Sequence, residues 1–256
     1  MLEAADALLS LPAPVIALLV AAIWGLIAFA IHRFAVPFLC GKDGRKLGKF
    51  EAEVTSQIAL AFGLLISFNA VWIWDRSERV HAAVVDEAIA LNSIVSDAEL
   101  LEDAALRDAL CAGVGAYAKH LIEVEWPTLS DSSAQRSRPA EFRALTVLVR
   151  KTNDDHMRDA LNTAEEARDL RIRDGLAHMS PPRWGVVVML GLLLLVSIGA
   201  LHGESRRGRI LALTLVTLAI SFCFAVLLVH ARPFVGAEAI RPDDLRDVLF
   251  RASTRY

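Results

Sequence analysis

The chain has 256 residues, a formal net charge of −3 and a hydrophobic content of 55%. Its mean hydropathy of +0.43 is too high for an ordinary soluble domain of this length, which excludes that class. We expect no nucleic-acid partner for this slightly acidic chain.

Four stretches of about 20 residues contain no Asp, Glu, Lys or Arg. At about 1.5 Å per residue, each can cross a hydrocarbon core of about 30 Å as a helix. The alternative, a large soluble core of buried helices, would need a soluble shell that the remaining residues are too few to supply. We therefore predict an all-α protein with four transmembrane helices, at 12–32, 54–74, 184–203 and 210–231.

The segment before the first apolar stretch, MLEAADALLS, does not fit a cleaved signal peptide. It is acidic and has no Lys or Arg, whereas a signal peptide starts with a positively charged region. The apolar stretch is also longer than is typical of such peptides. We expect it to be a retained membrane helix.

The second apolar stretch continues into a polar block without a helix breaker. No proline occurs between positions 54 and 101, and Gly63 is the only glycine there. The pattern predicts one helix of about 48 residues, roughly 70 Å long. Such a helix would couple the membrane segment to the polar block, which a simple anchor would not need.

The polar block, 75–183, holds 20 acidic and 14 basic residues, a net charge of −6. Apolar residues every three or four positions predict an amphipathic helix up to about Leu101, and a second one over 102–125 that ends before Trp126 and Pro127. After a polar loop, a helix is expected from near Pro139 to about His178.

Acidic residues are concentrated in 86–125, which has nine of them and only two basic residues. Two interpretations stay open. The charges can be the solvated faces of a helical bundle, or they can line a vestibule that raises the local concentration of cations.

Two stripes run along the second apolar stretch. Small residues recur at spacings of three and four, which is typical of close helix packing. Large apolar residues recur at spacings of four and could form stacked apolar rings in an oligomer, a gate that closes by dewetting. The small stripe is Ser56, Ala59, Gly63, Ser67 and Ala70, and the large one is Leu60, Leu64 and Phe68.

No motif for catalysis, cofactor binding or metal binding was found. The three cysteines are far apart, and the seven histidines have no metal-ligand partner at helical spacing. We expect no enzyme, no cofactor and no metal site.

Three segments resemble a known family. FNAVWIWDRSERVHAAVVDEAIAL is similar to the bestrophin signature, whose positions fall here on Phe68, Asn69, Trp74 and Arg76. RPFVGAEAIRPDDL, with Pro233, Phe234 and Gly236, resembles the segment after the last bestrophin helix. Together with EWP and EEARDLR in the polar block, these motifs resemble an uncharacterised bacterial family of bestrophin-like membrane proteins.

This resemblance implies a homopentameric ion channel in the bacterial inner membrane, whose second helix lines the pore. Its hydrophobic neck would fall on Leu60, Leu64 and Phe68. The partners would be other copies of the chain, the lipid bilayer and small ions. Asn69 departs from the family pattern, which usually has a basic residue there. The acidic calcium cluster of animal bestrophins is not reproduced, so we expect no calcium gating.

Loop charges and the resemblance disagree on orientation. Basic residues in both short connecting loops favour a cytoplasmic position for these loops, whereas the resemblance implies the reverse. The functional alternatives are an ion channel, or a membrane-anchored sensor or scaffold whose helical block binds a partner. The expected segments are 1–74 and 184–231 in the membrane, the helical block 75–183, and a C-terminal tail, 232–256.

Overall fold

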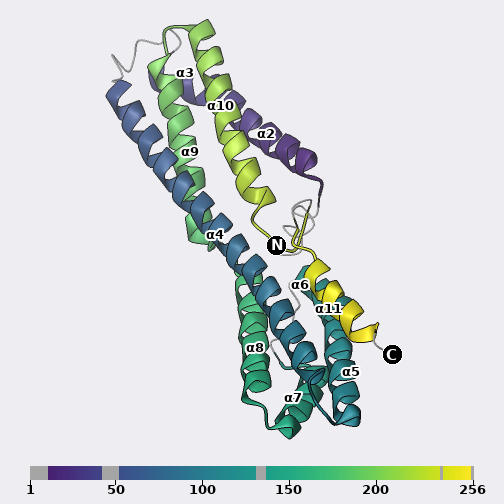
Figure 1. Ribbon diagram of the computed structural model, residues 1–256. Helices are drawn as coiled ribbons and strands as arrows, with labels where there is room; N and C mark the ends of the chain where they lie inside the picture. Colours follow the sequence, from purple (N-terminus) through teal and green to yellow (C-terminus); the bar gives the residue numbers. More distant parts are fainter. Residues whose placement is uncertain (1–10, 42–51, 131–136, 237–238, 255–256) are drawn as a thin grey trace. The chain divides into compact units, whose positions relative to one another are not determined.

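The computed structural model describes residues 11–41, 52–130, 137–236 and 239–254. Within these ranges the secondary structure is helical and contains no strand, as Figure 1 shows. Four of the described helices are long and apolar enough to cross a membrane. The predicted all-α class with four membrane helices is therefore confirmed.

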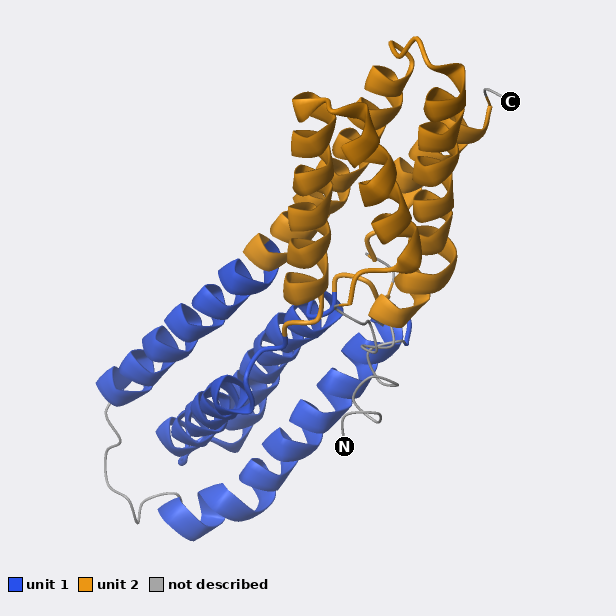
Figure 2. Ribbon diagram, turned by 90° about the horizontal axis from the view of Figure 1, so that it is seen from below, with its two compact units in different colours: residues 1–74, 178–232 blue, residues 75–177, 233–256 orange. Residues whose placement is uncertain are grey.

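The chain divides into two compact units (Figure 2). Unit 1 comprises residues 1–74 and 178–232, and unit 2 comprises residues 75–177 and 233–256. Unit 1 contains α2 (Ala13–Ala30), η1 (Ile31–Ala35), α3 (Val36–Cys40), the first part of α4 (Ala52–Ala98), α9 (Pro181–Leu201) and α10 (Arg206–Val229). Unit 2 contains the rest of α4, α5 (Ala104–His120), η2 (Leu121–Glu125), α6 (Trp126–Ser130), α7 (Ala140–Thr152), α8 (Asp155–Gly175) and α11 (Asp243–Ser253).

The helix α4 runs for 47 residues through both units without a break, as predicted. It ends in a tighter turn, in which the N–H groups of Leu100 and Leu101 donate to the carbonyls of Asp97 and Ala98, three residues earlier. The Asp103 carboxylate then accepts a hydrogen bond from the Leu106 N–H at 3.1 Å and starts α5.

The prediction that a helix ends before Trp126 and Pro127 is wrong. The helix continues through a π turn, in which the Trp126 N–H bonds to the Leu121 carbonyl five residues earlier. Proline cannot donate a hydrogen bond and clashes with the carbonyl of the preceding turn in a regular α-helix. The wider turn directly before the proline accommodates both effects.

A π turn before a proline also lengthens the first membrane helix. The stretch was expected to end at His32, but a second π turn at Ile31–Ala35 precedes Val36 and Pro37, and helix continues to Cys40. Pro37 occupies one of the first positions of the new α-helical segment, where its missing N–H costs little.

The single helix predicted from Pro139 to His178 is also wrong, because two helices occupy this region. Asn153 ends α7 in the left-handed conformation, with φ of 55°. Asp154 then caps α8 by accepting hydrogen bonds from the N–H groups of His156 and Met157. Asn in this conformation and Asp as a cap are typical of such a break.

Unit 1 is held together by close contacts at small residues. A Cβ atom added to Gly191 in α9 would lie 2.8 Å from the Trp24 ring, and one added to Gly199 would lie 2.7 Å from a Val36 methyl group. Trp24 also packs on Phe224 of α10, with ring centroids 5.1 Å apart. Glycine lets these membrane helices approach closely.

Unit 2 has a continuous apolar core formed by α4, α5, α7, α8 and α11. Leu91, Leu110 and Leu145 are fully buried in it. The tail also contributes, because α11 places Leu245 and Val248 in the same core. This helix was not predicted from the residue pattern.

Candidate functional site

One face of α4 in unit 1 carries large apolar side chains that contact little of their own chain. Leu60, Leu64 and Phe68 are 65%, 52% and 69% exposed. The opposite face is packed, with Phe62 and Ile73 buried. Because helical residues three or four apart share a face, the three exposed side chains form a continuous stripe. We call it the α4 stripe.

Most of the small residues beside the α4 stripe contact little of the described part of the chain. Ser56, Ala59, Gly63 and Ser67 are exposed, and Ala70 is half-buried. A Cβ atom on Gly63 would meet nothing within 4 Å. The two serine hydroxyls donate to carbonyls four residues earlier in the same helix. As far as the described residues go, this surface is therefore open to lipid or to another molecule.

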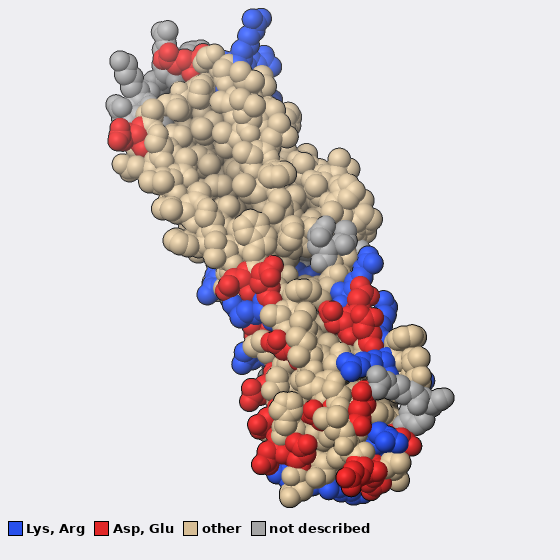
Figure 3. Space-filling view, viewed as in Figure 1, with Lys and Arg blue, Asp and Glu red and all other residues tan. Residues whose placement is uncertain are grey.

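The membrane-like part of α4 is the least enclosed of the four candidate spans, with 17% of its most apolar window buried. The visible surface of unit 1 is mostly uncharged, whereas Lys, Arg, Asp and Glu gather over unit 2 (Figure 3). A large, continuous exposed apolar surface marks a membrane or protein interaction site.

The three signature residues do not share one surface. Asn69 is buried, and its amide donates to the Leu65 carbonyl of its own helix at 2.9 Å. Trp74 is 49% exposed, close to the end of the α4 stripe. Arg76 is buried in unit 2, where it donates to the Ala177 carbonyl. Arg76 therefore holds the segment after α8 against α4.

A buried ion cluster lies inside unit 2. Arg171 of α8 donates to Glu87 of α4 at 2.9 Å and to Glu125 of η2 at 2.6 Å. Arg168 donates to Glu125 at 2.6 Å, and the Tyr117 hydroxyl donates to Glu87 at 2.8 Å. These five side chains are all buried. Two arginines and two glutamates balance in charge, which makes burial tolerable.

The pKa values within the cluster show how strongly its members interact. Burial raises the pKa of Tyr117 well above its usual value, and the neighbouring Glu87 carboxylate raises it further. Burial alone would lower the pKa of Arg171, but the carboxylates of Glu87 and Glu125 outweigh burial and raise it. The cluster thus keeps Tyr117 neutral and Arg171 charged.

The motifs that carry the family resemblance meet at this cluster. EWP supplies Glu125 and Trp126, and EEARDLR supplies Arg168 and Arg171. The Arg171 guanidinium also lies 5.4 Å from the Trp126 ring centroid. The interpretation of acidic residues as solvated is wrong for Glu87 and Glu125. Charge pattern alone did not reveal their burial, because it does not show which helices meet.

The segment after the last membrane helix, with Pro233, Phe234 and Gly236, packs in the same region of unit 2. We call it the post-span motif. Phe234 packs edge-on against Trp126, with ring centroids 5.3 Å apart, and its ring lies against Gly175. A Cβ atom at Gly175 would clash with that ring. The Pro233 carbonyl accepts a hydrogen bond from the Ile240 N–H at 2.8 Å, and Gly236 has a φ of 98°. Only glycine adopts this backbone conformation readily.

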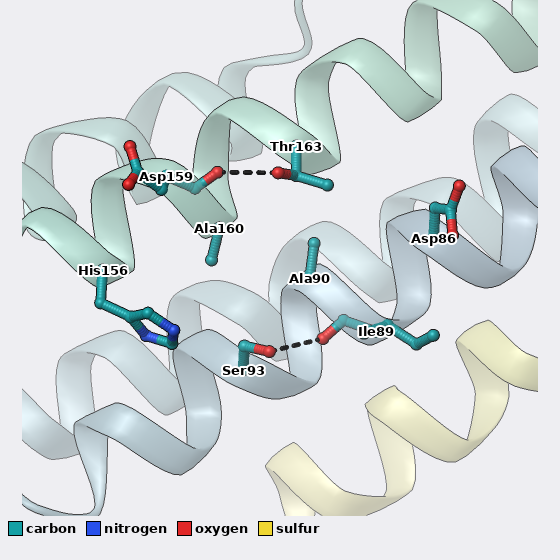
Figure 4. Close-up of a pocket in the computed structure, with 8 residues that line it drawn as sticks. All are labelled: Asp86, Ile89, Ala90, Ser93, His156, Asp159, Ala160 and Thr163. Carbon is teal, nitrogen blue, oxygen red and sulfur yellow. Dashed lines mark hydrogen bonds between the residues drawn. The ribbon is translucent and has the colours of Figure 1, made fainter.

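A groove of about 290 Å³ lies between α4 and α8 in unit 2. Figure 4 shows the residues that line this groove. The vestibule interpretation stays a prediction, because Asp86 is the only acidic residue of the stretch 86–125 that lines this groove, together with Asp159. Ser93 and His156 face it from opposite helices, and Asp97 lies 2.6 Å from His156 Nδ1. Ser93, however, donates to the Ile89 carbonyl of its own helix. Ser93, His156 and Asp97 are the residue types of a catalytic triad. An activated serine would donate its hydroxyl proton to the histidine ring, and this hydrogen bond is not formed here.

No group of three or more His, Cys, Asp or Glu residues in the described ranges is placed to hold a metal ion.

Comparison with known proteins supports one family. The model of the Bestrophin-like domain matches residues 45–245, which is most of the chain. Searches of curated proteins and of solved structures returned no significant match. The matched region includes the α4 stripe, the buried ion cluster and the post-span motif. The chain therefore belongs to the bestrophin-like family of membrane proteins.

Proposed function

We propose that this protein is a homo-oligomeric ion channel, a multi-pass protein of the bacterial inner membrane in which α4 lines the pore. The observation that carries this proposal is the α4 stripe. It places Leu60, Leu64 and Phe68 on one continuous surface that the described chain leaves uncovered. Family membership favours a channel over an enzyme.

The stripe has the chemistry of a hydrophobic neck. Around a symmetry axis, each residue would become a ring, and three rings would stack along the pore. Such a constriction offers an ion no replacement for its hydration shell, so it closes by losing water. The small residues beside the stripe would allow neighbouring copies of α4 to approach closely.

Assembly is the first requirement of the proposal, because one chain cannot enclose an axis with a single stripe. The family resemblance implies five copies. Light scattering of the detergent-purified protein should give a multiple of the 27.9 kDa chain mass that corresponds to a pentamer. A monomer would contradict the channel and leave the sensor or scaffold as the function to test.

The gate is tested by replacing Leu60, Leu64 and Phe68 together with Ala. The substitution removes bulk at the axis while keeping an apolar residue with high helix propensity. We expect a large rise in ion flux through liposomes that contain the variant.

A matched control exists on α10. Leu211, Leu215 and Phe222 are the same residue types and are 62%, 59% and 72% exposed. Their replacement with Ala should leave the flux at its wild-type level. Equal flux from both triple variants would show that the α4 stripe is an ordinary lipid-facing surface.

A further inference from the structure

A second surface of unit 1 is a groove of about 690 Å³ between the first membrane helix and α10. One wall is formed by α2 and η1, and the other by α10. The helices run antiparallel, because Trp24 packs on Phe224 near one end and His32 meets Arg209 near the other. The groove therefore follows the helix axes within the membrane-spanning region.

One end of the groove is positively charged. Arg33 and Arg206 line it together with His32. Arg209 is engaged elsewhere, donating to His32 Nδ1 at 3.1 Å and to the Gly203 carbonyl at 3.2 Å. In the described residues, Arg33 and Arg206 form no ion pair, and no Asp or Glu lines the groove. Two exposed cations are thus available to an anion.

The rest of the groove is lined by small or apolar residues, and the polar side chains among them are hydroxyls of Thr and Ser. From Ile210 to Ser221 the α10 wall is about 16 Å long, which is about half of a 30 Å hydrocarbon core. The groove therefore extends through about one leaflet. Its walls below the charged end are Ala21, Gly25, Ala28, Phe29, Ile210, Leu213, Thr214, Thr217, Leu218 and Ser221.

We propose that this groove binds an anionic phospholipid, with the phosphate between Arg33 and Arg206 and one acyl chain along Gly25. The ligand must be amphipathic, because one end of the groove is cationic and the rest is apolar. It must also reach from the level of the headgroups to the middle of the bilayer. A phospholipid meets both requirements, and the arginines select an anionic headgroup over a zwitterionic one.

Gly25 lines the groove and has no side chain to fill it. A Cβ atom at this position would meet nothing within 4 Å, so a larger side chain can enter the groove without a clash against the described protein. Gly185 in α9 is equally open and does not line the groove. The pair allows the groove to be filled in one variant while the other controls for a new exposed apolar side chain.

The test is native mass spectrometry of the detergent-purified full chain, titrated with phosphatidylglycerol or with phosphatidylcholine of the same acyl chains. The wild type should bind phosphatidylglycerol more tightly. Replacing both Arg33 and Arg206 with Ala should weaken that binding about thirtyfold, since each basic residue near the surface contributes roughly fivefold. The exposed Arg207, which does not line the groove, is the control, and Arg207→Ala should bind as the wild type does.

The acyl-chain part of the proposal is tested by Gly25→Leu, which should lose bound phosphatidylglycerol, whereas Gly185→Leu should retain it. Equal binding of the two lipids by the wild type, or wild-type binding by the double arginine variant or by Gly25→Leu, would overturn the proposal. A third result would also overturn the proposal: the wild type binds no lipid and Gly25→Leu changes the number of subunits. The groove would then be an interface between copies of the chain. Channel flux enters none of these outcomes, so they are independent of the proposed function.

Discussion

The two parts of α4 use the same residue types in opposite ways. In unit 1, Leu60 and Leu64 are more than half exposed, whereas in unit 2 Leu91 is fully buried among four other helices. Both parts belong to one helix without a break. An exposed leucine is unfavourable in water but costs nothing in a bilayer, whose interior is equally apolar.

This difference shows that hydrophobicity alone does not identify the core of this protein. In unit 2 the helices pack around apolar side chains that are buried away from water, and buried ion pairs join the same helices. In unit 1 the helices are held by close packing at Gly191 and Gly199, and the apolar surface outside is left for lipid or other copies. Four tests of this comparison follow, from the largest expected effect to the smallest.

The largest effect is expected from Glu125→Gln in the buried ion cluster. The substitution keeps the shape of the side chain but removes one of the two negative charges in the cluster, so Glu87 alone balances two buried arginines. Breaking a buried pair in this way costs about 3–5 kcal/mol in the free energy of unfolding. Urea unfolding in detergent measures it. The exposed neighbour Glu123 is the control, and an equal loss for Glu123→Gln would mean that the cluster is not essential to unit 2.

A second test compares two leucines of α4. Leu91→Ala should destabilise unit 2 by about 2–5 kcal/mol, because it leaves a cavity in a closed core. Leu60→Ala should change the free energy of unfolding by less than about 0.5 kcal/mol, since the side chain is already exposed. Similar losses for the two variants, measured by thermal unfolding in the same detergent, would remove the distinction between the two parts of the helix.

A third test compares two glycines in the membrane helices. Gly191→Ala should destabilise unit 1 by about 1–3 kcal/mol, because the new methyl group forces the buried Trp24 ring to move. Gly63→Ala has open space and should not destabilise the isolated chain. If the small stripe packs between copies, light scattering should show weaker assembly for Gly63→Ala. Unchanged thermal stability of Gly191→Ala would contradict the packing described for unit 1.

The smallest effect concerns pH. The hydrogen bond to Asp97 raises the pKa of His156 above its usual value of 6.5. The folded state therefore binds this proton more tightly, and the stabilisation is complete below pH 6.5 and lost as pH rises through the raised pKa. The melting temperature of the wild type should exceed that of His156→Gln at acidic pH, and the two should converge at alkaline pH. Asp97→Asn should abolish the difference, and a constant difference at all pH values would contradict the assignment.

Several features could be predicted from the sequence because they depend on local properties. Length and absence of charge identified the four membrane helices, and the lack of breakers identified α4 as one helix. The spacing of Leu60, Leu64 and Phe68 predicted a common face, which the structure shows as exposed. The break at Asn153 was missed, although Asn followed by two Asp residues is a recognisable signal for a helix end and a new cap.

Other features could not be predicted, because they depend on contacts between distant segments. The π turns before Pro37 and Pro127 continue helices that proline normally ends, and the surrounding packing decides whether the wider turn is tolerated. The burial of Glu87 was equally hidden, since a glutamate is buried only when a charge partner arrives from another helix. That partner, Arg171, is 84 residues away in the chain.

The sequence by itself determined the helical class, the membrane-spanning segments and the family, because length, hydrophobicity and short motifs are written along the chain. Only the tertiary structure decided which charged residues are buried, which face of α4 is left uncovered and where a cationic end meets an apolar groove. Those properties arise when helices far apart in the chain pack together. Their packing sets the exclusion of solvent and the distance between charges, and these two quantities set the energies.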